Sequence, residues 1–200
     1  MKTLILCFPS YAYGIIDLGV EKIAKGLRRL TLIEDLTLEF GNSDKVTASG
    51  LKFIGKSLKK LASSLSRLRL RFIGCRNVKD TALGHLGESL KSLNRLESLD
   101  IGFPIGSMLS QPGIINFFKV LQAPLKSFRF DTAYSYLIKD QTLKRLSGVL
   151  IRNEGLQNLS CTFTFNIDTT DAGFDFLCQG IKRLENLKHQ FEFLELQSPD

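Results

Sequence analysis

A pattern of apolar residues that returns about every 30 positions is the feature that most constrains the fold of this chain. Within each copy the apolar residues recur at i, i+3 and i+7, and the first copy has Val20, Ile23 and Leu27. This spacing covers one face of an α-helix and predicts six amphipathic helices. Successive copies start 31, 32, 31, 29 and 31 residues apart. The copies begin at Gly19, Gly50, Ala82, Gly113, Thr142 and Gly173.

A second pattern lies between these segments, where apolar residues alternate with polar ones, as in Leu4-x-Leu6-x-Phe8. A period of two predicts strands with one buried face. The predicted strands are centred on Leu6, Leu38, Leu70, Ile101, Phe130 and Cys161. We expect a further strand within residues 191–196. A stacked ladder of rings is expected from Phe8, Phe40, Phe72, Phe103 and Phe163.

One strand and one helix in each repeat predict an α/β solenoid, because neither element can bury its apolar face alone. We expect a single domain over residues 1–200, built from about six βα repeats of 29–32 residues. In the resulting horseshoe, a parallel sheet forms the concave face and the helices form the convex face. The chain lacks an uninterrupted apolar run of about 18 residues, so we predict no membrane-spanning helix.

The run LSRLRLRFIGCRNVKDTALGHLGESLKSLNRLESLDI at residues 65–101 resembles a leucine-rich repeat of the ribonuclease-inhibitor-like class. The segment CRNVKDTALGHL resembles the cysteine-containing repeats found beside F-box domains, and the Phe of L-x-L-x-F resembles repeat families of ciliates and other protists. The resemblance implies a horseshoe that binds partners on its concave face. Ribonuclease inhibitor is acidic and rich in cysteine, whereas this chain carries a net charge of +7 and four Cys.

Acidic residues stand two positions before the start of four predicted helices, at Asp17, Asp80, Asp140 and Asp171. Their carboxylates suit the free N–H groups and the positive dipole end of a helix N-terminus. We therefore interpret these residues as caps of their own helices and not as catalytic groups.

The polar positions of the third strand are all arginine. Arg67, Arg69 and Arg71 should point out from the concave face of the sheet, with Asp100 and Arg129 on the following strands. Two explanations for this cluster stay open: the arginines pair with carboxylates on flanking strands, or with the acidic surface of a partner. The flanking carboxylates are Asp35, Glu39, Asp100 and Asp131. We predict a partner-binding site formed by Arg67, Arg69, Arg71, Asp100 and Arg129.

The basic excess lies entirely within residues 1–100, which hold 17 Lys and Arg against 10 Asp and Glu. An excess of this kind favours acidic partners or nucleic acid. The many lysines on the convex helices lack neighbouring aromatic residues for base stacking, so nucleic acid is disfavoured.

No combination of residues indicates catalysis, a cofactor or a metal. The chain has two His, His85 and His189, and neither has an evident catalytic partner. The segment from Gly50 to Ser57 matches the P-loop pattern, but it lies inside a predicted helix and not after a strand. The four Cys form no C-x-x-C pair and are expected to be reduced thiols.

The sequence therefore predicts a cytoplasmic, non-catalytic scaffold or adaptor that binds a protein, with an acidic surface expected on the partner. A first alternative is a structural subunit of a large assembly, such as a cytoskeletal or ciliary complex, docked by its ends, its irregular loops or its convex lysines. A second alternative is the substrate-recognition module of a ubiquitin ligase. A third is a nucleic-acid-associated subunit.

Overall fold

The computed structural model describes residues 2–9, 15–104, 109–132, 138–163 and 169–187, with the side chain of Phe163 outside this set. Strands and helices alternate along the chain. The strands are β1 Thr3–Phe8, β2 Asp35–Gly41, β3 Arg67–Ile73, β4 Ser98–Gly102, β5 Ser127–Thr132 and β6 Asn158–Phe163. The α-helices are α1 Asp17–Leu27, α2 Ala48–Leu58, α3 Asp80–Leu90, α4 Gln111–Val120, α5 Asp140–Ile151 and α6 Asp171–Ile181. A 3₁₀ turn at Lys59–Leu61 follows α2. Each strand and the helix after it are called a unit, numbered 1 to 6.

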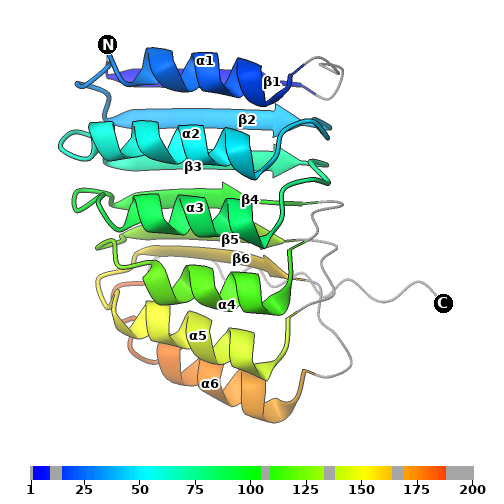
Figure 1. Cartoon of the computed structure of the whole chain (residues 1–200). Helices are drawn as coiled ribbons and strands as arrows, with labels where there is room; N and C mark the ends of the chain where they lie inside the picture. The colour runs from blue at the N-terminus through cyan, green and yellow to red at the C-terminus, as the bar shows by residue number, and fades with distance from the viewer. Residues whose placement is uncertain (1, 10–14, 105–108, 133–137, 164–168, 188–200) are drawn as a thin grey trace.

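The six strands form one parallel sheet in the order β1-β2-β3-β4-β5-β6. The helices cover one face of this sheet, and they spread farther apart along the stack than the strands do (Figure 1). The uncovered face of the sheet is therefore the inner, concave face. This architecture confirms the predicted α/β leucine-rich-repeat solenoid. Within the described residues no helix is long and apolar enough to cross a membrane.

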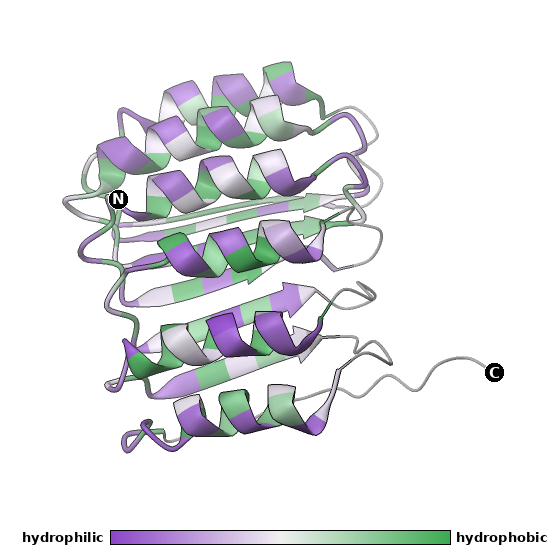
Figure 2. Ribbon diagram, turned by 60° about the horizontal axis from the view of Figure 1, so that its bottom comes forward, coloured by the Kyte–Doolittle hydropathy of each residue, from purple (hydrophilic) through white to green (hydrophobic). Residues whose placement is uncertain are grey.

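The core lies between the sheet and the helices and consists mainly of Leu and Phe side chains. Strand register places equivalent residues side by side, so Phe8, Phe40, Phe72 and Phe103 stack with ring centroids 5.3, 5.5 and 5.5 Å apart. This confirms the first four rungs of the predicted ladder. Unit 5 has Thr132 at the ladder position, which ends the run of rings there. Figure 2 shows apolar (green) and hydrophilic (purple) residues interspersed along the helices.

The helix-start aspartates act on the neighbouring unit, which corrects the expectation that each caps its own helix. Asp17, Asp80 and Asp140 are each the first residue of a helix, and their carboxylates accept hydrogen bonds from the start of the next helix. The Thr47 N–H donates to Asp17 at 2.8 Å, and the Thr170 N–H donates to Asp140 at 2.8 Å. The Ser110 N–H donates to Asp80 at 2.7 Å. Stacking therefore brings each carboxylate to the N-terminus of the following helix.

Several sequence predictions concern residues outside the described part of the chain. They include the further strand within residues 191–196, the ring of Phe163, His189, and residues 105–108 and 133–137 of the irregular loops at 103–113 and 132–138. The segment that matches the P-loop pattern lies in α2, where Gly50, Gly55 and Ser57 are buried in helix packing. This placement confirms the helical interpretation of that segment.

Candidate functional site

The concave face is lined by the alternate strand residues that point away from the helices. Parallel pairing sets these residues side by side in rows across the sheet. One row contains Asp35, Arg67 and Ser98, and the next contains Thr37, Arg69, Asp100 and Arg129. A third row contains Glu39, Arg71, Gly102 and Asp131. The predicted site residues therefore come together on three neighbouring strands, β3, β4 and β5.

Arg67 lies at the start of β3 and pairs with the strand before it. Its Nε donates to Asp35 Oδ2 at 2.9 Å, while 56% of the Arg67 side chain stays exposed. Both Nη groups of Arg67 have no acceptor among the described residues. The Arg67 guanidinium is thus held in place through its Nε, and its two Nη groups remain available to donate hydrogen bonds to a partner.

Arg69 bridges two strands from the middle of β3. Its Nε lies 3.0 Å from Asp100 Oδ2 on β4 and 3.4 Å from Glu39 Oε1 on β2. About half of the side chain, 48%, is exposed, and its Nη groups have no acceptor in the described part of the chain. Arg69 therefore resembles Arg67 in presenting unused donors to the concave side.

Arg71 is buried, which differs from the solvent-facing position expected from the strand pattern. Its Nη2 lies 2.8 Å from Asp100 Oδ1, and its Nη1 donates to Asp131 Oδ2 at 2.7 Å. Only 9% of the side chain is exposed. Gly102 gives it room, because a Cβ at Gly102 would lie less than 3.0 Å from the Arg71 guanidinium. Arg71 can therefore lie across β4 and reach β5.

The charged residues in these contacts are called the ion-pair ladder, defined as Asp35, Glu39, Arg67, Arg69, Arg71, Asp100 and Asp131. Arg69 and Arg71 share Asp100 and so link Glu39 to Asp131, while Asp35 and Arg67 form a separate pair beside them. Of the two explanations left open by the sequence, the structure shows the first: flanking carboxylates pair with all three arginines. With Arg129 included, four cations meet four anions, so the concave face carries no net charge. The strand pattern predicted the members of this ladder but not the burial of Arg71.

Arg129 is the cation of this face that stands outside the ladder. It is half-buried on β5 between Asp100 and Ser160, and its Nε has no hydrogen-bond partner among the described residues. Asp100, its neighbour in the row, is already engaged by Arg69 and Arg71. The Ser160 hydroxyl beside it also lacks a partner in the same part of the chain. The Arg129 Nε and the Ser160 hydroxyl are thus buried polar groups beneath the concave face, without a partner among the described residues.

A shallow hollow of about 290 Å³ opens over the ladder. It is lined by Asp35, Thr37, Arg67, Leu68, Arg69, Ser98 and Asp100. The lining offers guanidinium and hydroxyl donors together with carboxylate acceptors, which suits recognition of polar side chains or peptide groups.

Cys7 lies on the neighbouring strand β1. Burial and the nearby Glu39 carboxylate raise the pKa of the Cys7 thiol, whose Sγ lies 3.6 Å from Glu39 Oε2.

The described residues contain no cluster of three or more His, Cys, Asp or Glu side chains placed to hold a metal ion. His85 is half-buried on α3. All four cysteines are free thiols, with Cys75 and Cys161 buried and Cys7 and Cys178 exposed.

The fold defines the chain as a leucine-rich-repeat-like βα solenoid, and one solved structure shares this fold over most of its length. The actin-binding site 2 of leiomodin-1 has a TM-score of 0.56 and 16% sequence identity, over 81% of this chain and 89% of that one. The yeast Rad7 and Elc1 complex has a TM-score of 0.44 and 17% identity, over 91% of this chain and 50% of that one. No family model and no curated protein sequence matches the chain. At these identities the likeness concerns the fold.

Proposed function

We propose that this chain is a non-catalytic protein-interaction module that binds its partner on the concave face of the sheet. The observation that carries the proposal is the pair of half-exposed arginines, Arg67 and Arg69, each anchored through Nε with both Nη groups unused by the described residues. An anchored guanidinium loses little side-chain entropy on binding, and its free edge can grip a carboxylate or a peptide carbonyl.

Within this proposal the five predicted residues divide into two roles. Arg67 and Arg69 are the main contact residues, because each keeps exposed donors that no described residue uses. Arg129 is assigned to the contact through the exposed part of its half-buried side chain, since its Nε is buried. Asp100 and the buried Arg71 hold these groups in place, since Asp100 pairs with both Arg69 and Arg71. A partner is expected to present individual carboxylates or carbonyl groups among neutral polar ones, because the concave face is neutral overall.

The repeat length of 29–32 residues with a helix in every unit fits the ribonuclease-inhibitor-like class, which we propose for this chain on its sequence pattern. A cytoplasmic adaptor remains the favoured role. The structural-subunit alternative has a direct probe in purified actin, since the similar structure from leiomodin-1 is an actin-binding site. The ubiquitin-ligase and nucleic-acid alternatives have no observation in their favour among the described residues of the concave face.

The experiment compares the tagged chain with an Arg67→Ala/Arg69→Ala variant in affinity purification from native cells, followed by mass spectrometry. These two side chains are exposed, so the variant should keep its fold. The matched control is Lys56→Ala/Lys59→Ala, which removes two exposed cations from the convex side. We expect a partner that the wild type and the control retain and that the concave variant loses at least about tenfold. Equal recovery by all three proteins would refute the concave site.

A further inference from the structure

The two ends of the solenoid, formed by α1 with β1 and by α6, carry complementary halves of the contact that joins neighbouring units. Figure 1 shows α1 and α6 at opposite ends of the stack of helices. The contact has a fixed register inside the chain, so the residues that would meet across an end-to-end contact can be named in advance.

The first part of the register joins Asp at helix position 1 to Gly at position 3 of the next helix. A Cβ at Gly50, Gly113 or Gly173 would lie less than 3.0 Å from a carboxylate oxygen of the preceding unit. The carboxylates belong to Asp17, Asp80 and Asp140 respectively. Units 3 and 5 follow units without this Asp, and they carry Ala82 and Thr142 at position 3. Glycine therefore stands at position 3 where an aspartate must fit.

Both halves of this pair are unused at the ends. Gly19 is position 3 of α1, and a Cβ built on it meets no described atom within 4 Å. Asp171 is position 1 of α6, is exposed, and accepts no hydrogen bond within the described part of the chain. The α1 end thus carries the glycine, and the α6 end carries the aspartate. The N-cap of α1 is Ile16, so this end offers a backbone N–H to the aspartate but not the hydroxyl that Thr47, Ser110 and Thr170 donate inside the chain.

A second part of the register joins position 8 of one helix to position 10 of the next. The Ser57 hydroxyl donates to the Ala24 carbonyl at 2.6 Å, and a Cβ at Gly180 would lie less than 3.0 Å from Ser147. The unused end residues are again small and accessible. Gly26 is position 10 of α1 with open space beside it, and Cys178 is position 8 of α6 and is exposed.

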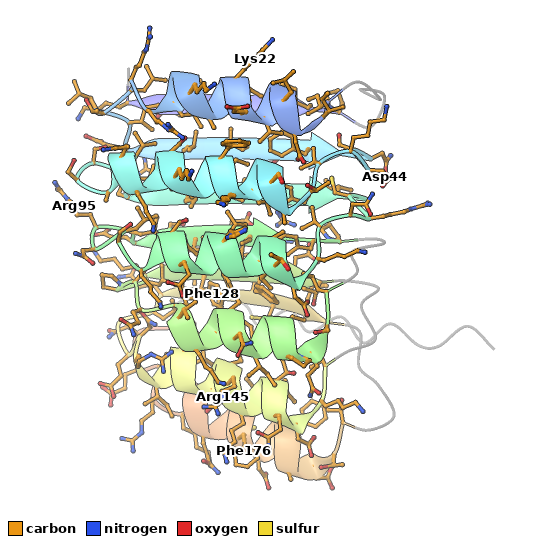
Figure 3. All side chains as sticks on the ribbon, viewed as in Figure 1. Lys22, Asp44, Arg95, Phe128, Arg145 and Phe176 are labelled. Carbon is orange, nitrogen blue, oxygen red and sulfur yellow. The ribbon has the colours of Figure 1, made fainter. Side chains whose placement is uncertain are left out.

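A third part of the register brings opposite charges to the two ends. Lys144 at position 5 of α5 lies 4.8 Å from the ring of Phe176 at position 6 of α6. The equivalent end residues are Asp175 at position 5 of α6 and Lys22 at position 6 of α1. Lys22 points out from the α1 end in Figure 3 and has no ion pair among the described residues. Two α1 ends facing each other would oppose Lys22 with Lys22, so the charges favour α1 against α6.

Apolar surface at the α1 end agrees with burial by another unit. Leu4, Leu6 and Phe8 are only half-buried, whereas their register partners Leu36, Leu38 and Phe40 are fully buried. The nearby Ile16 and Leu18 are 39% and 54% exposed. In the described residues β1 pairs with β2 alone, which leaves one edge of the sheet open.

We infer that copies of this chain associate head to tail, with the α6 end of one copy stacked on the α1 end of the next. Asp171 would meet Gly19, Cys178 would meet Gly26, and Asp175 would pair with Lys22. Such a heterologous contact extends to open chains unless its rotation closes a ring. The inference does not depend on the concave-face proposal, because the end contact uses helix residues and the edge and core side of β1, and none of the concave-face arginines.

The test measures the mass of the purified chain by sedimentation velocity at rising concentration. The mass of the wild-type protein is expected to rise above that of a dimer. Gly19→Leu is expected to raise the dissociation constant of the association at least about tenfold. Gly84→Leu is the matched control, because Gly84 is also helical with no atom within 4 Å of a built Cβ but lies in α3, away from the ends. A wild type that stays monomeric at about 1 mM, or equal effects of the two leucines, would overturn the inference.

Two further variants test direction and charge. Lys22→Glu should weaken association about tenfold, because it replaces an attraction by a repulsion. The added change Asp175→Lys should restore the association by exchanging the two charges. A Gly19→Leu copy mixed with an Asp171→Ala copy should form a 1:1 dimer and nothing larger, since each keeps one working end. Absence of both the charge rescue and the mixed dimer would show that the ends do not meet in this register.

Discussion

Replacement of Arg71 by alanine should destabilise the protein far more than replacement of Arg67, although both belong to the same ladder. Arg71 is 9% exposed and pairs with Asp131, which is 11% exposed, and with Asp100. Removing one partner from a buried ion pair leaves a desolvated charge and costs about 3–5 kcal/mol. Arg67 and Asp35 are 56% and 29% exposed, so Arg67→Ala should cost at most about 1 kcal/mol.

The assay is urea unfolding followed by circular dichroism, with midpoints compared at a constant slope. In a separate thermal unfolding experiment, Arg71→Ala should lower the melting temperature by about 10 °C for a chain of this size, and Arg67→Ala by a few degrees at most. A double-mutant cycle of Arg71→Ala with Asp131→Ala should show a coupling of about 1–3 kcal/mol. If the two single variants unfold at the same urea concentration, the structural role assigned to Arg71 is wrong.

Three other outcomes follow from the core, the unit contacts and the thiols. Phe72→Ala removes a fully buried ring stacked between Phe40 and Phe103 and should cost about 3–5 kcal/mol in urea unfolding, against a smaller loss for Phe8→Ala at the half-buried end of the ladder. Hydrogen bonds from the Thr170 N–H and hydroxyl lower the pKa of Asp140, so the charged carboxylate stabilises the folded state. Asp140→Ala should therefore reduce the free energy of unfolding by its full amount above about pH 4, and the difference from wild type should vanish as the pH falls through the lowered pKa. Thiol labelling at pH 8 should modify Cys7 and Cys178 well before Cys75 and Cys161, since burial raises the pKa of Cys161 to about 12; four equal rates would contradict this burial.

The elements of the fold follow from local patterns, which is why the sequence predicted them. The strand centres Leu38 and Leu70 fall inside β2 and β3, because alternation along a strand depends on neighbours two residues away. The helices follow from the apolar spacing for the same reason. The ladder of rings was predictable up to Phe103, and Thr132 in the next unit marks in the sequence where it stops.

Contacts between units were harder to predict, because they join residues about 30 positions apart whose relation depends on how the helices stack. An aspartate at a helix start looks the same whether it caps its own helix or the next one. The two-unit alternation, in which Asp17, Asp80 and Asp140 precede units with glycine at position 3, is the signal that distinguishes the cases. Likewise Gly102, opposite Arg71, was the sequence sign that the arginine could fold across β4.

The distribution of charge separates the two surfaces proposed for binding. The four arginines of the concave face are matched by four carboxylates, so the net charge of +7 comes from residues outside this face. Binding on the concave face should therefore depend weakly on salt concentration. The face has no net charge, so it does not attract a partner over a long range, and the contacts are local hydrogen bonds and ion pairs. The ends differ, with Lys22 at one and Asp171 and Asp175 at the other, so head-to-tail association should weaken as salt rises. Salt dependence thus distinguishes the two contacts in the same protein without any substitution.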